Sequence, residues 1–249
     1  MARERLDRWL VDHSLVETQE KAQALIMAGS VFVNGQKAQK AGQLLPENPH
    51  VELSERLRFV SRGGLKLEGA LQRWNITPRG MVCGDFGSST GGFTDCLLQA
   101  GAIRVHAIDA GTNQLDWRLR SDARVVVREG VNARHLTAAD LGEELDLAVC
   151  DVSFISATKI APAMAASLKP DGGVVIILVK PQFEVARGMV GKGGIVRDPQ
   201  QHLECCEKVR ACVEQLGFET DIMESPITGA EGNKEFLLYG RRIATHSQN

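Results

Sequence analysis

Residues 81–93 read MVCGDFGSSTGGF, and this stretch decides the fold of most of the chain. An apolar run over residues 81–86 leads directly into a loop that contains Gly87, Gly91 and Gly92. Glycines let the backbone turn tightly after a strand, and they let a ligand approach the carboxyl end of that strand. The stretch therefore predicts the first strand of an α/β sheet, followed by a ligand-binding loop and a helix.

Strand-like and helix-like segments alternate along the rest of the chain, as in parallel sheets that helices cover on both faces. The predicted strands span residues 81–86, 105–108, 125–127, 145–149, 174–179, 220–223 and 236–239. Predicted helices over 92–100, 156–168 and 199–216 separate most of these strands. Because no helix separates the last two strands, we expect an antiparallel edge there. The pattern predicts an α/β fold with a Rossmann-like sheet of seven strands.

The glycine loop lacks the two common nucleotide-binding patterns. Its glycines lie at positions 84, 87, 91 and 92, which do not fit G-x-G-x-x-G, and no lysine follows them as in a phosphate-binding loop. Asp85 would also repel a phosphate group. An acidic, glycine-rich loop suits a cofactor with cationic groups, and S-adenosylmethionine carries a sulfonium and an ammonium group. We therefore expect S-adenosylmethionine as the cofactor.

A second carboxylate supports this prediction, because Asp109 ends the second predicted strand, where it can accept hydrogen bonds from both ribose hydroxyls. Glu129 or Asn132 could contact the adenine, although Asn132 could instead fix its own loop. The candidate cofactor-binding residues are Asp85, Gly87, Ser88, Ser89, Thr90, Gly91, Gly92, Phe93, Asp109, Asn132 and Asp151. A tight turn without a ligand is the alternative interpretation of the glycine loop.

Residues 1–58 predict a small, separate α+β module. The expected elements are helices over 5–11 and 19–28 and strands over 30–33 and 50–53. Thr18 can cap the second helix, and Gly29 stands where a helix commonly ends. The pair Asn34-Gly35 is a strong local signal for a hairpin turn.

The order of these elements resembles the small α-L RNA-binding module of a small-subunit ribosomal protein, pseudouridine synthases and tyrosyl-tRNA synthetases. The resemblance rests on Arg5-Leu6-Asp7, residues 21–26, Gly29 and residues 31–35. It implies RNA binding, with phosphate contacts from Arg5, Arg8, Lys21 and Lys37. Gln19 is a departure, because family members usually carry a basic residue there. Residues 1–58 hold eight basic and eight acidic residues, which predicts weak RNA affinity for the module alone, and a merely structural cap is the alternative.

Positive charge gathers between the two predicted domains and in one later loop. Residues 55–66 are strongly basic, and we expect Arg62 to face RNA, with a solvated linker as the alternative. The basic, glycine-rich segment 187–194 predicts a loop that closes over RNA, with Lys192 as a phosphate contact. Because the net charge of the chain is −2, RNA binding must rely on such local patches.

Composition excludes several other classes of protein. With 43% hydrophobic and 24% charged residues, the chain is typical of a globular protein and unlike a disordered one. The chain contains no apolar run of the ~18 residues that a membrane span needs, and its polar start leads into no signal-peptide core. The six cysteines form no C-x-x-C pair, so we expect neither a disulfide framework nor a metal site. We expect a cytoplasmic protein.

Five segments carry a resemblance that runs through nearly the whole chain. They are residues 60–67, 87–95, 150–155, 179–184 and 232–236. The chain resembles the TlyA (haemolysin A) family of ribosomal RNA ribose 2'-O-methyltransferases, whose catalytic domain is of the FtsJ type. Such enzymes use a Lys-Asp-Lys-Glu tetrad, and the matching positions are Lys66, Asp151, Lys180 and Glu235. We expect an RNA-binding module over 1–58, a linker and first helix over 59–79, and a methyltransferase domain over 80–249.

The chemistry of ribose methylation explains these residue types. A ribose hydroxyl is a poor nucleophile, so a base must take its proton while the oxygen attacks a methyl group. Lys180, directly after a predicted strand, is the expected proton acceptor, and Asp151 would orient it. Lys66 and Glu235 would position the ribose. Each lysine alone could equally be a solvated strand end or half of an ion pair.

The resemblance implies ribosomal RNA or ribosomal subunits as the partner and a cytidine ribose as the target. We expect no metal and no membrane partner, and we take a monomer as the working state, although the sequence does not determine the oligomeric state. Three alternatives stay open, namely a catalytically silent RNA-binding or ribosome assembly factor, a membrane-active haemolysin and a small-molecule methyltransferase.

Overall fold

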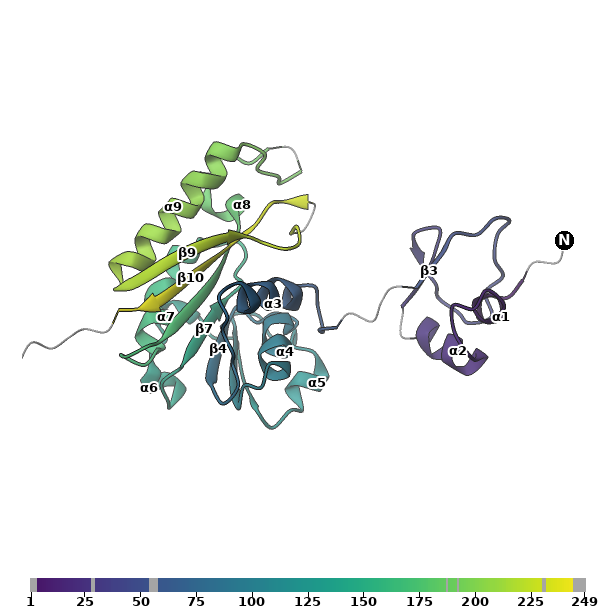
Figure 1. Cartoon of the computed structure of the whole chain (residues 1–249), viewed down its shortest axis with the longest axis horizontal. Coiled ribbons are helices and arrows are strands. Elements are labelled where there is room, and N and C mark those ends of the chain that lie inside the picture. Colours follow the sequence, from purple (N-terminus) through teal and green to yellow (C-terminus); the bar gives the residue numbers. More distant parts are fainter. Residues whose placement is uncertain are drawn as a thin grey trace, which may run out of the picture. The chain divides into compact units, whose positions relative to one another are not determined.

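The structure is a computed structural model that describes residues 4–27, 30–53, 58–186, 188–191, 193–229 and 232–243. The chain divides into two compact units, residues 1–58 and residues 59–249, and each is described by itself (Figure 1). The predicted helix end at Gly29, the predicted RNA contact Lys192 and the side chain of Lys37 lie outside the described part of the chain.

The first unit consists of two helices and a three-stranded antiparallel sheet. Its elements are α1 (Leu6–Asp12), α2 (Gln19–Met27), β1 (Val31–Val33), β2 (Gln36–Lys37) and β3 (Val51–Leu53), in the sheet order β2-β1-β3. Thr18 Oγ1 accepts a hydrogen bond from the backbone N–H of Lys21 at 3.2 Å, as the predicted helix cap requires. Asn34 and Gly35 both have positive φ angles and form the predicted turn between β1 and β2.

The second unit is a seven-stranded mixed sheet with helices on both faces. Its strands are β4 (Val82–Phe86), β5 (Arg104–Asp109), β6 (Val125–Glu129), β7 (Leu147–Cys150), β8 (Val174–Val179), β9 (Phe218–Glu224) and β10 (Phe236–Arg242). Its α-helices are α3 (Gly63–Arg73), α4 (Gly92–Gln99), α5 (Trp117–Arg120), α6 (Ala138–Leu141), α7 (Ala161–Ser167), α8 (Pro181–Glu184) and α9 (Pro199–Gln215). Two short 3₁₀ helices, η1 (Ala133–His135) and η2 (Ala157–Lys159), complete the described elements. Each predicted strand is present, although strand ends differ by a few residues.

The strand order β6-β5-β4-β7-β8-β10-β9 places a topological switch between β4 and β7. Strands β4 to β8 pair in parallel, whereas β10 is antiparallel to both β8 and β9, so the predicted antiparallel edge is confirmed. In open α/β sheets, ligands bind outside the carboxyl ends of the strands at such a switch.

Alternate residues of a strand face opposite sides of its sheet, and β8 shows both core layers. Ile176 and Leu178 pack with residues of α3 and α4, whereas Val175 and Ile177 pack with residues of α7 and α9. Figure 1 shows α3 and α4 on the opposite side of the sheet from α9. Since both faces are covered, the ends of the strands are the part of the sheet open to a ligand.

The prediction of a single helix over 156–168 is wrong. The structure has η2 and α7 there, with Ile160 at the junction between them. Pro162 lies in the first turn of α7, and it lacks the backbone N–H that a continuous helix would need at that position. The break turns the chain between the end of β7 and the helical layer.

Candidate active site

Two neighbouring cavities lie at the carboxyl ends of β4, β5 and β7. The smaller cavity, of about 160 Å³, extends from the glycine loop to Lys66. The larger cavity, of about 670 Å³, is lined by residues at and after the carboxyl ends of β5, β6 and β7. Gly87, Ser89 and Asp151 line both cavities. The predicted cofactor-binding residues that face one cavity or both are Asp85, Gly87, Ser88, Ser89, Thr90, Gly92, Phe93, Asp109, Asn132 and Asp151.

Two glycines give the loop its shape. Gly87 has a φ of 88°, and a Cβ atom there would lie 2.9 Å from the carbonyl oxygen of Asp151. Gly91 has a φ of 96° at the start of α4, and a Cβ atom there would lie 2.2 Å from a methyl group of Leu119. Gly87 therefore lets the backbone form the cavity wall, whereas Gly91 packs against Leu119 and turns the chain into α4.

Asp85 is fully buried at the end of β4 and faces the smaller cavity. Its Oδ2 accepts hydrogen bonds from the Thr94 backbone N–H at 2.9 Å and from the Thr94 hydroxyl at 2.7 Å. Its Oδ1 is buried and has no hydrogen-bond partner among the described residues. Burial raises the pKa of Asp85 to about 7, against the lowering effect of Thr94. A buried carboxylate oxygen left for a ligand fits the cationic groups of S-adenosylmethionine.

The carboxylate of Asp109 lines the larger cavity and is held by the backbone. It accepts hydrogen bonds from the N–H groups of Ser89 at 2.8 Å and Gly111 at 2.7 Å. These bonds tie the end of β5 to the glycine loop and fix the carboxylate at the wall of the larger cavity.

The two residues considered for the adenine have different surroundings. Glu129 accepts hydrogen bonds from the backbone N–H groups of residues 113–115 and pairs with Arg120 at 2.6 Å, so its carboxylate is used to hold a loop. The side chain of Asn132 accepts a hydrogen bond from the Arg134 N–H at 3.2 Å, and Asn132 also lines the larger cavity. Both roles considered for Asn132 are therefore compatible with its position.

The four tetrad positions form two ion pairs beside the smaller cavity. Lys66 of α3 lies 2.5 Å from Glu235, which directly precedes β10, and their side chains are 10% and 2% exposed. Lys180 follows β8 and lies 2.5 Å from Asp151, which follows β7. Lys66 and Asp151 both line the cavity, so the two pairs meet there although they come from distant parts of the chain.

Ser153 is a residue of this site that the sequence interpretation missed. Its hydroxyl accepts a hydrogen bond from Lys180 Nζ at 2.9 Å. Ser61 and Gly63 also line the smaller cavity. These residues stand in the matching segments 150–155 and 60–67, next to Asp151 and Lys66, so the segments contained the signal but the residue types alone did not.

The predicted RNA contacts whose side chains the structure describes belong to two units, and each is described within its own unit. Arg5 pairs with the buried Asp7 at 2.7 Å, and Lys21 pairs with Glu17 at 3.0 Å, both within the first unit. Arg8 is exposed. Arg62 belongs to the second unit, where it donates a hydrogen bond to the backbone carbonyl of Thr228 at 3.1 Å.

The sheet order, the glycine loop and the carboxylates around the cavities define a Rossmann-like methyltransferase. Residues 59–242 match the FtsJ-like methyltransferase family, and residues 4–49 match the S4 domain. The YqxC protein of Bacillus subtilis is 46% identical over 95% of this chain and 85% of its own length.

Two further relatives agree. The 16S/23S rRNA (cytidine-2'-O)-methyltransferase TlyA of Mycobacterium tuberculosis is 42% identical over 96% of this chain and 90% of its own length. A solved structure from Streptococcus thermophilus that carries the hemolysin name is 44% identical, covers 97% of this chain and 89% of that chain, and has a TM-score of 0.74. The chain belongs to the TlyA/hemolysin A family of S-adenosylmethionine-dependent rRNA 2'-O-methyltransferases, and the predicted family and fold are confirmed.

The described residues lack two features that would indicate a membrane span or a metal centre. No helix among them is long and apolar enough to cross a bilayer. Within the same residues, no group of three or more His, Cys, Asp or Glu side chains is arranged to hold a metal ion.

Proposed function

We propose that this protein transfers a methyl group from S-adenosylmethionine to the 2'-hydroxyl of a cytidine in ribosomal RNA. The observation that carries the proposal is the meeting of the Lys66–Glu235 and Lys180–Asp151 pairs beside a cavity whose carboxylates suit a cationic cofactor. The choice of cytidine rests on similarity to the Mycobacterium tuberculosis enzyme, whose name specifies that nucleoside.

We assign the proton transfer to Lys180. S-adenosylmethionine, when bound, supplies a methyl group on a positively charged sulfur, which the ribose oxygen attacks. As a neutral amine, Lys180 would donate one hydrogen to the Ser153 hydroxyl at 2.9 Å, remain 2.5 Å from the Asp151 carboxylate, and turn its lone pair toward the ribose hydroxyl. The hydroxyl proton then passes to Lys180 Nζ as the oxygen becomes a nucleophile.

Lys66 and Glu235 are the proposed ribose-positioning pair. Lys66 lines the cavity, and the buried carboxylate of Glu235 fixes its ammonium group. A fixed donor beside the cavity can hold a ribose oxygen in line for attack, which is the effect that orientation has on rate.

We propose that the first unit binds structured RNA and that ribosomal subunits are the partner of the enzyme. The enzyme is proposed to act as a monomer in the cytoplasm. Arg5, Arg8, Lys21, Lys37, Arg62 and Lys192 remain predicted phosphate contacts. Among those of the first unit with described side chains, Arg8 has the stronger case, because Arg5 and Lys21 are paired with Asp7 and Glu17.

Transfer of labelled methyl groups to ribosomal subunits and to naked ribosomal RNA tests this function, with hydrolysis of the product in alkali. A 2'-O-methyl group blocks cleavage at its own nucleotide, so the label is expected in alkali-resistant dinucleotides. Label in mononucleotides would mean base methylation, and S-adenosylmethionine binding without transfer to either RNA would favour a silent RNA-binding factor.

A further inference from the structure

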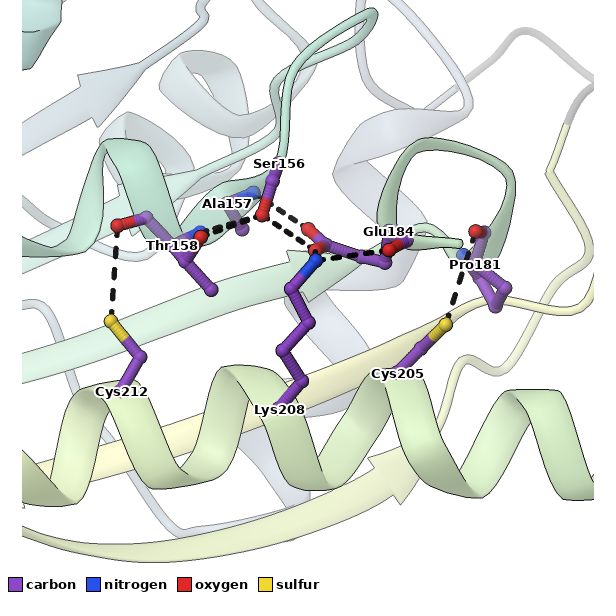
Figure 2. A network of polar contacts seen from close by, with 8 residues as sticks. All are labelled: Ser156, Ala157, Thr158, Pro181, Glu184, Cys205, Lys208 and Cys212. Atoms are coloured by element: carbon purple, nitrogen blue, oxygen red, sulfur yellow. Dashed lines mark hydrogen bonds and ion pairs between the residues drawn. The ribbon is translucent and has the colours of Figure 1, made fainter. Parts of the chain in front are cut away.

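Glu184 ends the short helix α8, four residues after Lys180, and its side chain is buried at 2% exposure. Its Oε1 accepts a hydrogen bond from the Ala157 N–H at 2.7 Å. Its Oε2 accepts one from the Ser156 hydroxyl at 2.6 Å and pairs with Lys208 of α9 at 3.0 Å. Figure 2 shows these groups converging on one carboxylate.

These contacts join the two segments that carry the candidate catalytic residues. Asp151 precedes Ser156 by five residues, and Lys180 precedes Glu184 by four. The Lys180–Asp151 ion pair joins the two segments at their first residues, and the Glu184–Ser156 hydrogen bond joins them at their last residues. The chain from 151 to 156 is therefore held at both ends against the chain from 180 to 184.

The held segment needs such support, because Phe154 has a φ of 67°. A bulky residue in this region is strained, and strain of about 1–3 kcal/mol persists only where the surroundings impose it. The side chain of Phe154 is 91% exposed, so it contributes little burial of its own. Contacts on both sides, from Ser153 to Lys180 and from Ser156 to Glu184, hold the backbone in place, together with the ring contact of Phe154 with Phe183, whose centroids lie 5.2 Å apart.

We propose that Glu184 is a positioning residue that fixes Asp151 and Ser153 against Lys180 and so aims the Lys180 amine. The inference rests on the proposed function. The side-chain contacts of Glu184 are with Ser156, Ala157 and Lys208, and they include neither Asp151 nor Lys180. Glu184 therefore acts through the segment that it holds.

Glu184→Gln is a sharp test, because it keeps the shape of the side chain. Its single oxygen can accept from Ala157, but its NH₂ group then replaces Oε2, faces the donor Lys208 Nζ, and can bond Ser156 Oγ only if that hydroxyl turns to donate to Thr158 Oγ1 instead. Turning the amide over restores an acceptor for these donors and loses the Ala157 bond. No rotamer of glutamine therefore satisfies all three contacts.

Glu143→Gln is the matched control. Glu143 is also held by two side chains of the second unit, Arg104 at 2.9 Å and His106 at 2.9 Å. Glu143 precedes β7, whereas Asp151 follows it, so the two residues lie at opposite ends of that strand. We expect Glu184→Gln to lower kcat about 100-fold at saturating cofactor and RNA, as a small misplacement of reacting groups does, with the KM for RNA changed less than threefold. Glu143→Gln should keep kcat within twofold. A kcat within twofold of wild type for Glu184→Gln, or an equal loss in Glu143→Gln, would overturn the proposal.

Two further measurements keep the test decisive. Ser156→Ala should lower kcat, and Ser156→Thr, which keeps the hydroxyl, should restore it, so a Thr variant as slow as the Ala variant would contradict the proposal. Hydrogen exchange needs no substrate, and we expect the amides of residues 152–157 to exchange faster in Glu184→Gln than in wild type. Unchanged exchange would overturn the positioning role of Glu184. Faster exchange in the variant, together with an inactive wild-type enzyme, would refute the proposed function alone.

Discussion

Removing one member of the buried Lys66–Glu235 pair should destabilise the second unit, whereas removing both should not. The two side chains are 10% and 2% exposed and lie 2.5 Å apart, so each is the charge partner of the other in a site with little water. Lys66→Met leaves a buried carboxylate, and Glu235→Leu leaves a buried ammonium group. The double variant leaves neither.

The expected size follows from known costs of unpaired buried charges. Breaking a buried pair by removing one partner costs about 3–5 kcal/mol, whereas replacing both partners by apolar groups is often neutral. For a unit of this length, 1 kcal/mol corresponds to roughly 2–4 °C, so each single variant should melt roughly 6–20 °C below wild type. The double variant should melt within a few degrees of wild type.

Thermal unfolding of the four proteins, together with their methyl transfer rates, separates stability from activity. All three variants should lose transfer, including the stable double variant, because the proposed ribose-positioning lysine is absent from two of them and its anchor from the third. Single variants that melt within 1 °C of wild type, or a double variant less stable than both singles, would refute the electrostatic reasoning. An active double variant would refute the assigned role.

Three other predictions concern the loop and the first unit. The pKa of Asp85 lies near 7 in the folded protein against an ordinary value of 3.8, so the folded state holds this proton longer and stability should fall as pH rises from about 4 to 7. Asp85→Asn should remove that slope from a plot of Tm against pH, and parallel curves for variant and wild type would speak against it. Gly87→Ala should abolish S-adenosylmethionine binding in titration calorimetry while the protein stays folded. The φ of 88° at Gly87 and the nearby carbonyl of Asp151 leave no room for a methyl group, and undiminished affinity would contradict this. The Arg5 guanidinium holds the pKa of Asp7 well below its usual range, so Asp7 stabilises the first unit above pH 4, and this contribution should be lost as pH falls further. Asp7→Asn should flatten that acid transition in a circular dichroism titration, and an unchanged transition would count against the assignment.

The sequence predicted those parts of the structure that follow from local patterns. Apolar runs identified most of the seven strands, because a strand buried on both faces needs consecutive apolar residues. Lys66, Asp151, Lys180 and Glu235 were found through matching segments, and the structure brings them into two pairs.

Other features depend on contacts between distant segments, which no local pattern specifies. Ser153 and Glu184 have residue types that are common on protein surfaces, and only the register of β7 beside β8 brings them to Lys180 and Ser156. The pairing of Arg5 with Asp7 likewise depends on how α1 begins and on the contacts of Asp7 with α2. The RNA-binding prediction for Arg5 did not include this competing carboxylate.

The most direct test of the central claim is the rate of 2'-O-methyl transfer by Lys180→Ala compared with Lys169→Ala. Lys169 is a matched control, because it also lies 2.5 Å from an aspartate, Asp146. Lys169 precedes β8, whereas Lys180 follows it, so the two lysines lie at opposite ends of that strand. Loss of a general base typically lowers a rate by about 10²–10⁴, so Lys180→Ala should lose at least 100-fold of the label in alkali-resistant dinucleotides while Lys169→Ala keeps the wild-type rate. Equal rates for the two variants would show that Lys180 is not the group that accepts the ribose proton.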